Sequence, residues 1–134
     1  MPTPTGPFNL ATTYLKLRTD SLVDPLPVTP EFWQRLMSGA LGDFKNERLV
    51  TMVSFDASWP VAEMHPKGDE IVCLVSGRVT MVLETDGREQ LAELSEPGAY
   101  VIVPKGTWHT ARTSEPCRMF FITPGEGTEH RKIA

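Results

Sequence analysis

Short apolar runs alternate with turn-forming residues along most of the chain from residue 47 onward. One boundary between two runs, Asp86-Gly87, is a strong signal for a two-residue hairpin turn, because glycine tolerates the positive φ that such a turn requires. Ser76-Gly77 is a weaker signal of the same kind. The pattern predicts β-strands near residues 47–55, 60–65, 70–76, 78–84, 88–94, 98–103, 107–113 and 117–123.

The N-terminal part of the chain follows a different pattern. Residues 12–18 alternate well enough for a strand, whereas three prolines within residues 24–30 argue against regular structure there. Thr29 is a good N-cap and Pro30 suits the first helical position, so we expect a short helix over residues 30–38. The apolar face of this helix, at helical spacing, consists of Phe32, Trp33, Leu36 and Met37.

Strands at this spacing, without helices between them, predict an all-β domain, either a sandwich or a barrel. The length of 134 residues suits one domain. Several strands are apolar on both faces; in one of them, Val72 and Leu74 point one way while Ile71 and Cys73 point the other. One face can line the interior, and the other must be covered by the helix or by a second subunit. We therefore expect a homodimer.

Charge and composition exclude several classes of protein. The formal net charge is −4 and no long run of Lys or Arg occurs, so the chain lacks the basic face on which nucleic-acid binding rests. No apolar run approaches the ~20 residues that a membrane span needs, and residues 1–10 do not resemble a signal peptide. Cys73 and Cys117 share no metal-type spacing and suit buried thiols in a reducing compartment. We expect a cytoplasmic protein that binds neither nucleic acid nor membrane.

Candidate chemistry lies mainly in residues 63–77. Glu63 and His65 are two apart on a predicted strand, so both side chains leave it on the same face. A turn follows, and Glu70 then opens the next strand. Far along the chain, His109 follows a Pro-x-Gly turn and begins another strand. Two carboxylates and two imidazoles are a donor set that suits a divalent transition metal.

The spacing of these residues resembles the two motifs of the cupin family. The family patterns are G-x5-H-x-H-x3,4-E-x6-G and G-x5-P-x-G-x2-H-x3-N. This sequence has Ala57-x5-Glu63-x-His65-x4-Glu70-x6-Gly77 and Gly98-x5-Pro104-x-Gly106-x2-His109-x3-Thr113. The resemblance implies a double-stranded β-helix, the jelly-roll barrel, with a metal inside it. It also implies a single cupin domain over residues 1–134: a helix-bearing N-terminal arm (1–45), the barrel (46–124) and a tail (125–134).

Three positions depart from the family patterns. Ala57 and Thr113 replace residues that are not ligands in the family, whereas Glu63 replaces a histidine ligand. The resemblance assigns the metal to Glu63, His65, Glu70 and His109. We expect Fe, Mn, Ni or Zn; two carboxylates with two neutral imidazoles neutralise a divalent ion and favour the harder metals.

Other interpretations of these residues remain open. Glu63 could be a general base or a solvated residue at the rim instead of a ligand. His65 and His109 could be core histidines of a barrel without metal. Glu70, within an apolar strand, is the best single indication of a cation, because burying an unpaired carboxylate is costly. We expect His130, in the tail, to be exposed.

Alternation also predicts which side chains face the interior. Trp108 should point away from His109 and pack outside. The predicted lining of a small-molecule pocket is Val72, Leu74, Ala111 and Phe121, with Thr107 and Met119 beside them. The alternative is that these residues simply fill the barrel.

Three functions are consistent with the sequence. The first is a metal-dependent enzyme acting on a small organic molecule, of the dioxygenase or the isomerase/lyase type. The second is a non-catalytic module that binds a small ligand. The third is a barrel without a functional metal. The fold does not choose among them.

Overall fold

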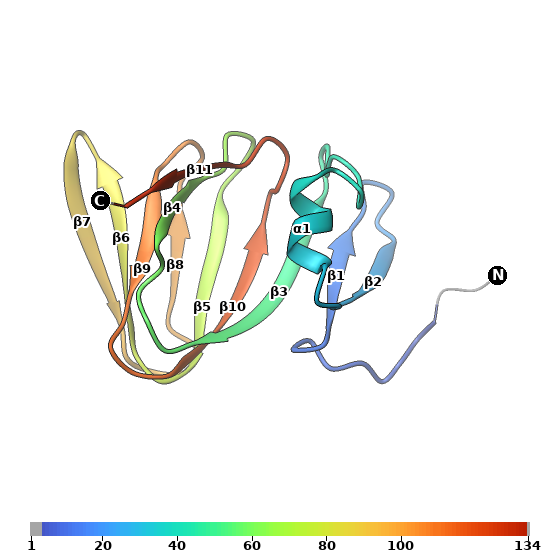
Figure 1. The fold of residues 1–134 in the computed structure, drawn as a ribbon, viewed down its shortest axis with the longest axis horizontal. Helices are drawn as coiled ribbons and strands as arrows, with labels where there is room; N and C mark the ends of the chain where they lie inside the picture. Colours follow the sequence, from blue (N-terminus) through green and yellow to red (C-terminus); the bar gives the residue numbers. More distant parts are fainter. Residues whose placement is uncertain (1–3, 134) are drawn as a thin grey trace.

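The computed structural model describes residues 4–133; residues 1–3 and 134, which belong to the predicted arm and tail, lie outside the described residues. The chain is mostly strand and forms two antiparallel sheets (Figure 1). The six-stranded sheet has the order β2 (Val23–Pro27), β1 (Thr13–Leu17), β3 (Arg48–Phe55), β10 (Cys117–Thr123), β5 (Glu70–Ser76) and β8 (Tyr100–Val103). The five-stranded sheet has the order β11 (Glu129–Lys132), β4 (Val61–Met64), β9 (His109–Arg112), β6 (Val79–Thr85) and β7 (Arg88–Leu94).

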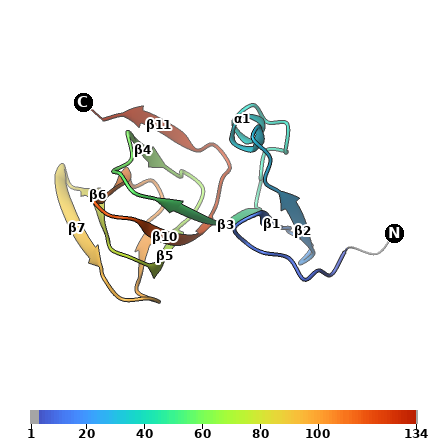
Figure 2. The same cartoon turned by 60° about the horizontal axis from the view of Figure 1, so that its bottom comes forward.

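The two sheets face each other across one apolar core (Figure 2). Val72 and Met119 enter it from the six-stranded sheet, and Met81 and Ala111 enter it from the five-stranded sheet; all four are fully buried. This arrangement has the predicted all-β, two-layer character and is consistent with a jelly roll. Inward and outward side chains alternate along β5 and β10, as the period of a strand requires.

Glycines make the turns that the sequence indicates. Asp86 and Gly87 both have positive φ, and Thr85 pairs with Arg88, so β6 and β7 form the predicted tight hairpin. At Gly77 a side chain is excluded by space as well as by backbone conformation. A Cβ there would lie 2.2 Å from the carbonyl oxygen of Pro116.

The N-terminal region differs from the sequence prediction in two ways. Residues 23–27 form strand β2 despite their prolines. This strand lies at the edge of its sheet, where a missing N–H leaves no partner unpaired. Helix α1 (Phe32–Met37) is shorter than expected, and Thr29 does not cap it with its side chain. Its buried residue Phe32 packs edge-on against Tyr14, with ring centroids 5.1 Å apart.

Helix α1 does not cover the outer face of the six-stranded sheet. Phe32 joins a second core cluster with Leu49, which belongs to the inward row of β3. The outer face instead carries two rows of uncharged side chains, and each row runs across neighbouring strands. Tyr100 and Ile102 are 62% and 55% exposed there. The rows are Met52–Phe120–Cys73–Tyr100 and Ile122–Ile71–Ile102.

The predicted tail also contains regular structure. Residues 129–132 form β11, which pairs with β4 at the edge of the five-stranded sheet. Trp108 is half-buried on the outside, as alternation predicts, and the Arg131 guanidinium lies 4.6 Å from its ring centre. Both cysteines are free. Within residues 4–133, every helix is too short or too polar to cross a membrane.

Candidate metal centre

Four side chains meet between the two sheets, at the end where β4 and β10 finish and β5 and β9 begin. Glu63 lies in β4 directly opposite His109, the first residue of β9, so both side chains leave the five-stranded sheet on one face. His65 follows β4 immediately. Glu70 is the first residue of β5, in the other sheet. The structure therefore brings all four sequence-predicted ligand residues together.

The distances place nitrogen and oxygen donors around a common point. Glu70 lies between the imidazoles: its Oε1 is 3.0 Å from His109 Nε2 and its Oε2 is 3.3 Å from His65 Nε2. Glu63 Oε2 is 3.6 Å from His65 Nε2. One donor atom from each of Glu63, His65 and His109 lies within 4.8 Å of the others. This spacing suits ligands of one ion.

The site is buried on its inner side and open at Glu63. His65, Glu70 and His109 are 2–3% exposed. The Glu63 side chain is 28% exposed. Three donors therefore sit in the interior and the fourth faces the route to solvent.

Hydrogen bonds outside the cluster orient the two imidazoles. Thr128 donates its hydroxyl proton to the Gly125 carbonyl oxygen, so its oxygen accepts from His65 Nδ1, 2.8 Å away. His109 Nδ1 donates to the carbonyl oxygen of Thr107 at 3.0 Å. With the Nδ1 proton committed on both rings, both Nε2 atoms face the cluster as donor lone pairs in the neutral form. This is the usual second layer of support around a metal-binding histidine.

Glu70 is ionised despite its burial. Thr123 in β10 donates its hydroxyl to Glu70 Oε2 at 2.7 Å. Burial alone would raise the pKa of Glu70, but the two neighbouring imidazoles, in their protonated form, outweigh burial through hydrogen bonds and charge and lower the pKa to about 2. Burial alone would lower the pKa of His109, but the Glu70 carboxylate outweighs it and raises that pKa. The buried carboxylate thus attracts positive charge, and a metal ion must compete with a proton for His109.

These residues fit a divalent transition metal. His65 Nε2, Glu70 Oε1 and His109 Nε2 are buried and lack, among residues 4–133, a hydrogen-bond partner of acceptable geometry, although Oε1 and the His109 nitrogen are only 3.0 Å apart. Buried polar atoms without partners are uncommon and costly. A cation at the point they share would satisfy all three, and imidazole with carboxylate is an appropriate donor set for Mn, Fe, Ni or Zn.

The residues predicted to line a pocket belong to the apolar core. Val72, Leu74, Ala111 and Phe121 are at most 6% exposed and belong to one core cluster with Met119. This packing agrees with the alternative that they fill the interior, and their role as a lining stays a prediction. The half-buried Thr107 contributes its backbone carbonyl to His109.

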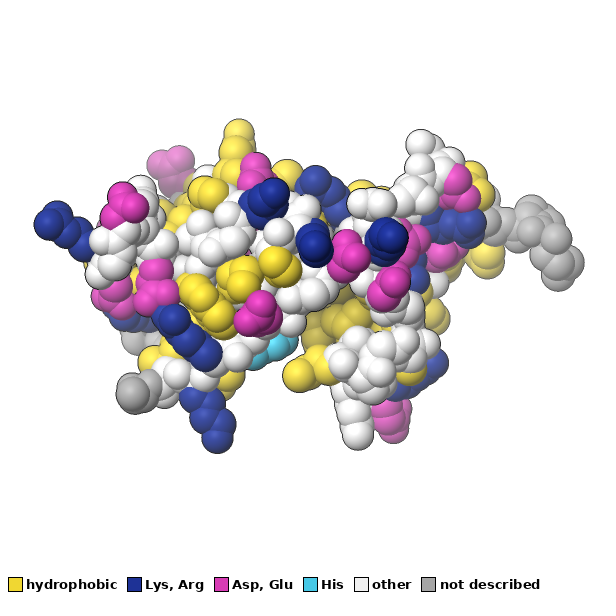
Figure 3. Space-filling view, turned by 90° about the horizontal axis from the view of Figure 1, so that it is seen from above, with side chains coloured by type: hydrophobic (Ala, Val, Ile, Leu, Met, Phe, Trp, Pro, Cys, Tyr) yellow, Lys and Arg dark blue, Asp and Glu magenta, His cyan; other side chains and the backbone are white. Residues whose placement is uncertain are grey.

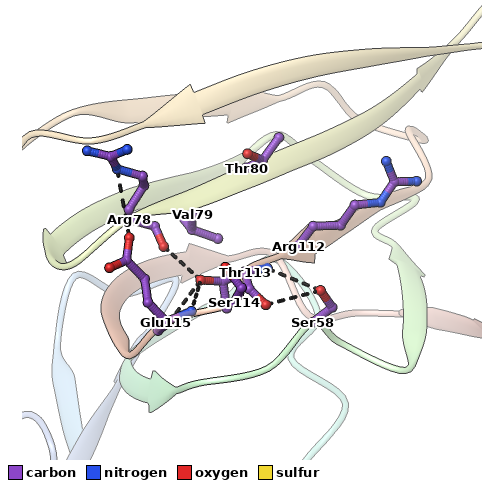
Figure 4. Close-up of a pocket in the computed structure, with 8 residues that line it drawn as sticks. All are labelled: Ser58, Arg78, Val79, Thr80, Arg112, Thr113, Ser114 and Glu115. Atoms are coloured by element: carbon purple, nitrogen blue, oxygen red, sulfur yellow. Dashed lines mark hydrogen bonds and ion pairs between the residues drawn. The ribbon is translucent and has the colours of Figure 1, made fainter.

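A separate hollow lies at the other end of β9 from His109 and is not lined by any of the four polar residues. It has a volume of about 350 Å³, and Arg78 and Arg112 lie on its wall. Figure 4 shows Arg78 beside Glu115, 3.8 Å away. Arg112 is paired at 2.7 Å with Glu89. Because both guanidinium groups already have carboxylate partners, this hollow offers little attraction for an anion.

Sequence reasoning missed two residues of the site, both carried by the C-terminal segment. Thr128 orients His65. His130, expected to be merely exposed in a tail, lies in β11 with its Nε2 3.6 Å from Glu63 Oε1. Strand β11 is polar throughout and gives no amphipathic signal. One sequence signal could have suggested this segment. His130 comes two residues after Thr128, which is the spacing of side chains on one face of a strand.

Comparisons with known structures show the fold. A cupin-2 domain protein from Shewanella frigidimarina is 24% identical over 60% of this chain and 72% of its own, with a TM-score of 0.50. A recombinant oxalate oxidase in complex with glycolate is 14% identical over 61% of this chain, with a TM-score of 0.52. Bacillus subtilis oxalate decarboxylase, described with Mn(II) centres, is 19% identical over 65% of this chain, with a TM-score of 0.50.

The chain spans 45% of the oxalate oxidase and 23% of the decarboxylase. No protein-family model and no curated protein sequence matches it. At these identities the likeness concerns the fold alone: the two facing sheets are arranged as in cupins, which is consistent with the jelly roll that the two motifs imply.

Proposed function

We propose that this chain binds one divalent transition metal through Glu63, His65, Glu70 and His109 and is a metal-dependent enzyme acting on a small organic molecule. The observation that carries the proposal is the convergence of three buried, unpartnered donor atoms from both sheets. A metal-free core has little reason to keep an ionised carboxylate and two imidazoles there, because burying charge without a partner is costly.

The donor set favours manganese or iron. Two carboxylates bring a charge of −2, which neutralises a divalent ion, and carboxylate oxygens suit harder metals better than thiolates do. The Mn(II) centres named for the decarboxylase of the same fold support this choice. Nickel and zinc accept the same donors and remain in the proposal as less favoured ions.

The chemistry we propose is of the dioxygenase or the isomerase/lyase type. When bound, such an ion supplies Lewis acidity at a substrate oxygen and, if it is redox-active, a means of activating dioxygen. His65, Glu70 and His109 hold fixed positions behind it, because each has a hydrogen bond to a group outside the cluster. Glu63, at the open side, is the residue that a substrate meets first.

Metal analysis of purified protein tests the proposal. Protein prepared without chelator should carry close to one equivalent of manganese or iron, and His109→Ala should lose it. Thr110→Val is the matched control, because Thr110 is a buried neighbour in β9 whose hydroxyl bonds to the Val61 carbonyl oxygen and not to the site. This control should keep the metal.

Two results would contradict the proposal in different ways. If wild type carries no metal, and added Mn²⁺, Fe²⁺, Ni²⁺ or Zn²⁺ does not raise its melting temperature, the chain is a metal-free cupin fold. If metal is bound and small acids or ketones bind without turnover, the chain is a ligand-binding module. The first result refutes the proposed metal site, whereas the second refutes only the proposed enzymatic activity.

We also propose that a second copy of the chain covers the outer face of the six-stranded sheet. Helix α1 packs elsewhere, which leaves Tyr100 and Ile102 exposed beside Ile71 and Phe120. The two rows on this face carry no charge, so two copies related by a two-fold axis can meet without opposing like charges.

A further inference from the structure

Strand β11 brings a third histidine, His130, next to the candidate ligands. His130 pairs directly with Glu63, and Glu63 pairs directly with His109. Residues directly opposite each other on neighbouring strands project from the same face of a sheet. His130, Glu63 and His109 therefore form one row across β11, β4 and β9, on the face that looks toward the other sheet.

The carboxylate of Glu63 stands between the interior and His130. Its Oε2 lies 3.6 Å from His65 Nε2, and its Oε1 lies 3.6 Å from His130 Nε2. The group of donor atoms within 4.8 Å of one another consists of Glu63, His65 and His109. His130 is not part of that group. It contacts the outer oxygen of the carboxylate, while the inner oxygen faces the cluster.

Each of the other three candidate ligands has a supporting group outside the cluster. His65 has the Thr128 hydroxyl, His109 has the Thr107 carbonyl and Glu70 has the Thr123 hydroxyl. The Glu63 carboxylate makes no hydrogen bond within the part of the chain that the structure describes, and its backbone pairs with β9 and β11. Its ion-pair contacts there are with His65 inside and His130 outside.

Exposure explains why Glu63 needs such support. Its side chain is 28% exposed and that of His130 is 36% exposed, whereas the other three ligands are buried. His130 is the one exposed histidine of the described chain. Figure 3 shows histidine atoms, in cyan, at the surface next to an acidic side chain, in magenta. An unrestrained glutamate has several rotatable bonds, and fixing it on a metal costs conformational entropy.

We infer that His130 is a positioning residue that holds Glu63 Oε1, so that Oε2 is directed at the metal. This inference rests on the proposed metal site. The present 3.6 Å separation exceeds a hydrogen bond by about half an ångström, which a small side-chain rotation closes. Removing groups that support a metal ligand lowers metal affinity by roughly 10- to 100-fold, and we expect the lower end here because Glu63 is one of four ligands.

The test measures Mn²⁺ binding by calorimetry and the Mn²⁺ electron paramagnetic resonance spectrum, so that catalytic turnover is not needed. His130→Ala should weaken Mn²⁺ binding about tenfold and change the spectrum. His130→Gln should restore both, because the glutamine amide can donate from nearly the position of the imidazole Nε2. Arg131→Gln is the matched control: it alters the adjacent β11 residue, which contacts Glu84 and Trp108 and not the site.

A double-mutant cycle separates positioning of Glu63 from an independent role. In the Glu63→Ala background, His130→Ala should have no further effect on Mn²⁺ affinity. The inference is overturned if His130→Ala binds Mn²⁺ as wild type does, if the loss persists in that background, or if Arg131→Gln causes the same loss. If wild type itself binds no metal, the proposed function has failed, and metal analysis shows this before any variant is compared.

Discussion

Thr128→Val removes the support of His65 while leaving all four candidate ligands in place. The hydroxyl oxygen accepts from His65 Nδ1 at 2.8 Å and donates to the Gly125 carbonyl oxygen at 3.0 Å. Valine has nearly the same shape as threonine and can do neither. The imidazole N–H is then left without a partner in a side chain that is 3% exposed.

The expected magnitude follows from that unpaired donor. A buried donor without an acceptor costs about 1–3 kcal/mol. His65 can avoid part of this cost by moving its proton to Nε2, but that tautomer cannot bind a metal through Nε2. Loss of a group that supports a metal-binding histidine typically lowers affinity 10- to 100-fold. Such a loss equals about 1.4 to 2.7 kcal/mol, in the same range as the hydrogen-bond cost.

Two measurements report the metal affinity and the tautomer of His65 separately. Calorimetry with Mn²⁺ should show affinity lowered by at least about tenfold in Thr128→Val. ¹⁵N chemical shifts of the His65 ring should show a larger Nε2–H population in the metal-free variant. Thr110→Val is the control, since it also removes a buried threonine hydroxyl bond, which is 2.9 Å long and goes to the Val61 carbonyl oxygen and not to a candidate ligand. The reasoning is refuted if both variants bind Mn²⁺ equally well.

Two further predictions concern pH and assembly. In the presence of a chelator, the pKa of Glu70 in the folded protein is about 2, below the value of ~4.3 in the unfolded chain. The Glu70 carboxylate therefore contributes fully to stability above pH ~4.3, and this contribution is lost as the pH falls toward 2. Urea unfolding should therefore show a steeper loss of stability over that range for wild type than for Glu70→Gln; equal slopes would contradict the assigned charge. Ile102→Lys should convert a dimer to a monomer in light-scattering measurements. Leu91→Lys, at a similarly exposed apolar position on β7, should leave the dimer intact. A monomeric wild-type protein would refute the proposed dimer.

The candidate ligands could be predicted because their geometry is mostly local. Glu63 and His65 are two residues apart at the end of one strand, and a short turn carries the chain to Glu70. A local pattern was not enough to predict His109 as a ligand, since only the second motif indicated where its strand would lie. The register Glu63↔His109, which sets the two side chains opposite each other, is a long-range pairing that no local pattern contains.

The parts that could not be predicted depend on position in the sheet. Prolines in β2 argue against a strand by local rules, yet an edge strand tolerates them. The polar strand β11 has no apolar face to bury, and its backbone pairing with β4 determines its place. The sequence pattern therefore predicts a tail at His130, although this residue lies beside Glu63.

The four candidate ligands belong to both layers of the molecule: Glu63 and His109 lie in the five-stranded sheet, and Glu70 lies in the six-stranded sheet. An ion bound by all of them would act as a cross-link between the sheets, much as a disulfide joins distant parts of a chain. Such a cross-link stabilises the whole domain, by about 2.7 kcal/mol when free metal is at one hundred times its dissociation constant. Removal of the metal by a chelator should then loosen the contact between the two sheets. Amide hydrogens of β5 and β9 should both exchange faster with solvent.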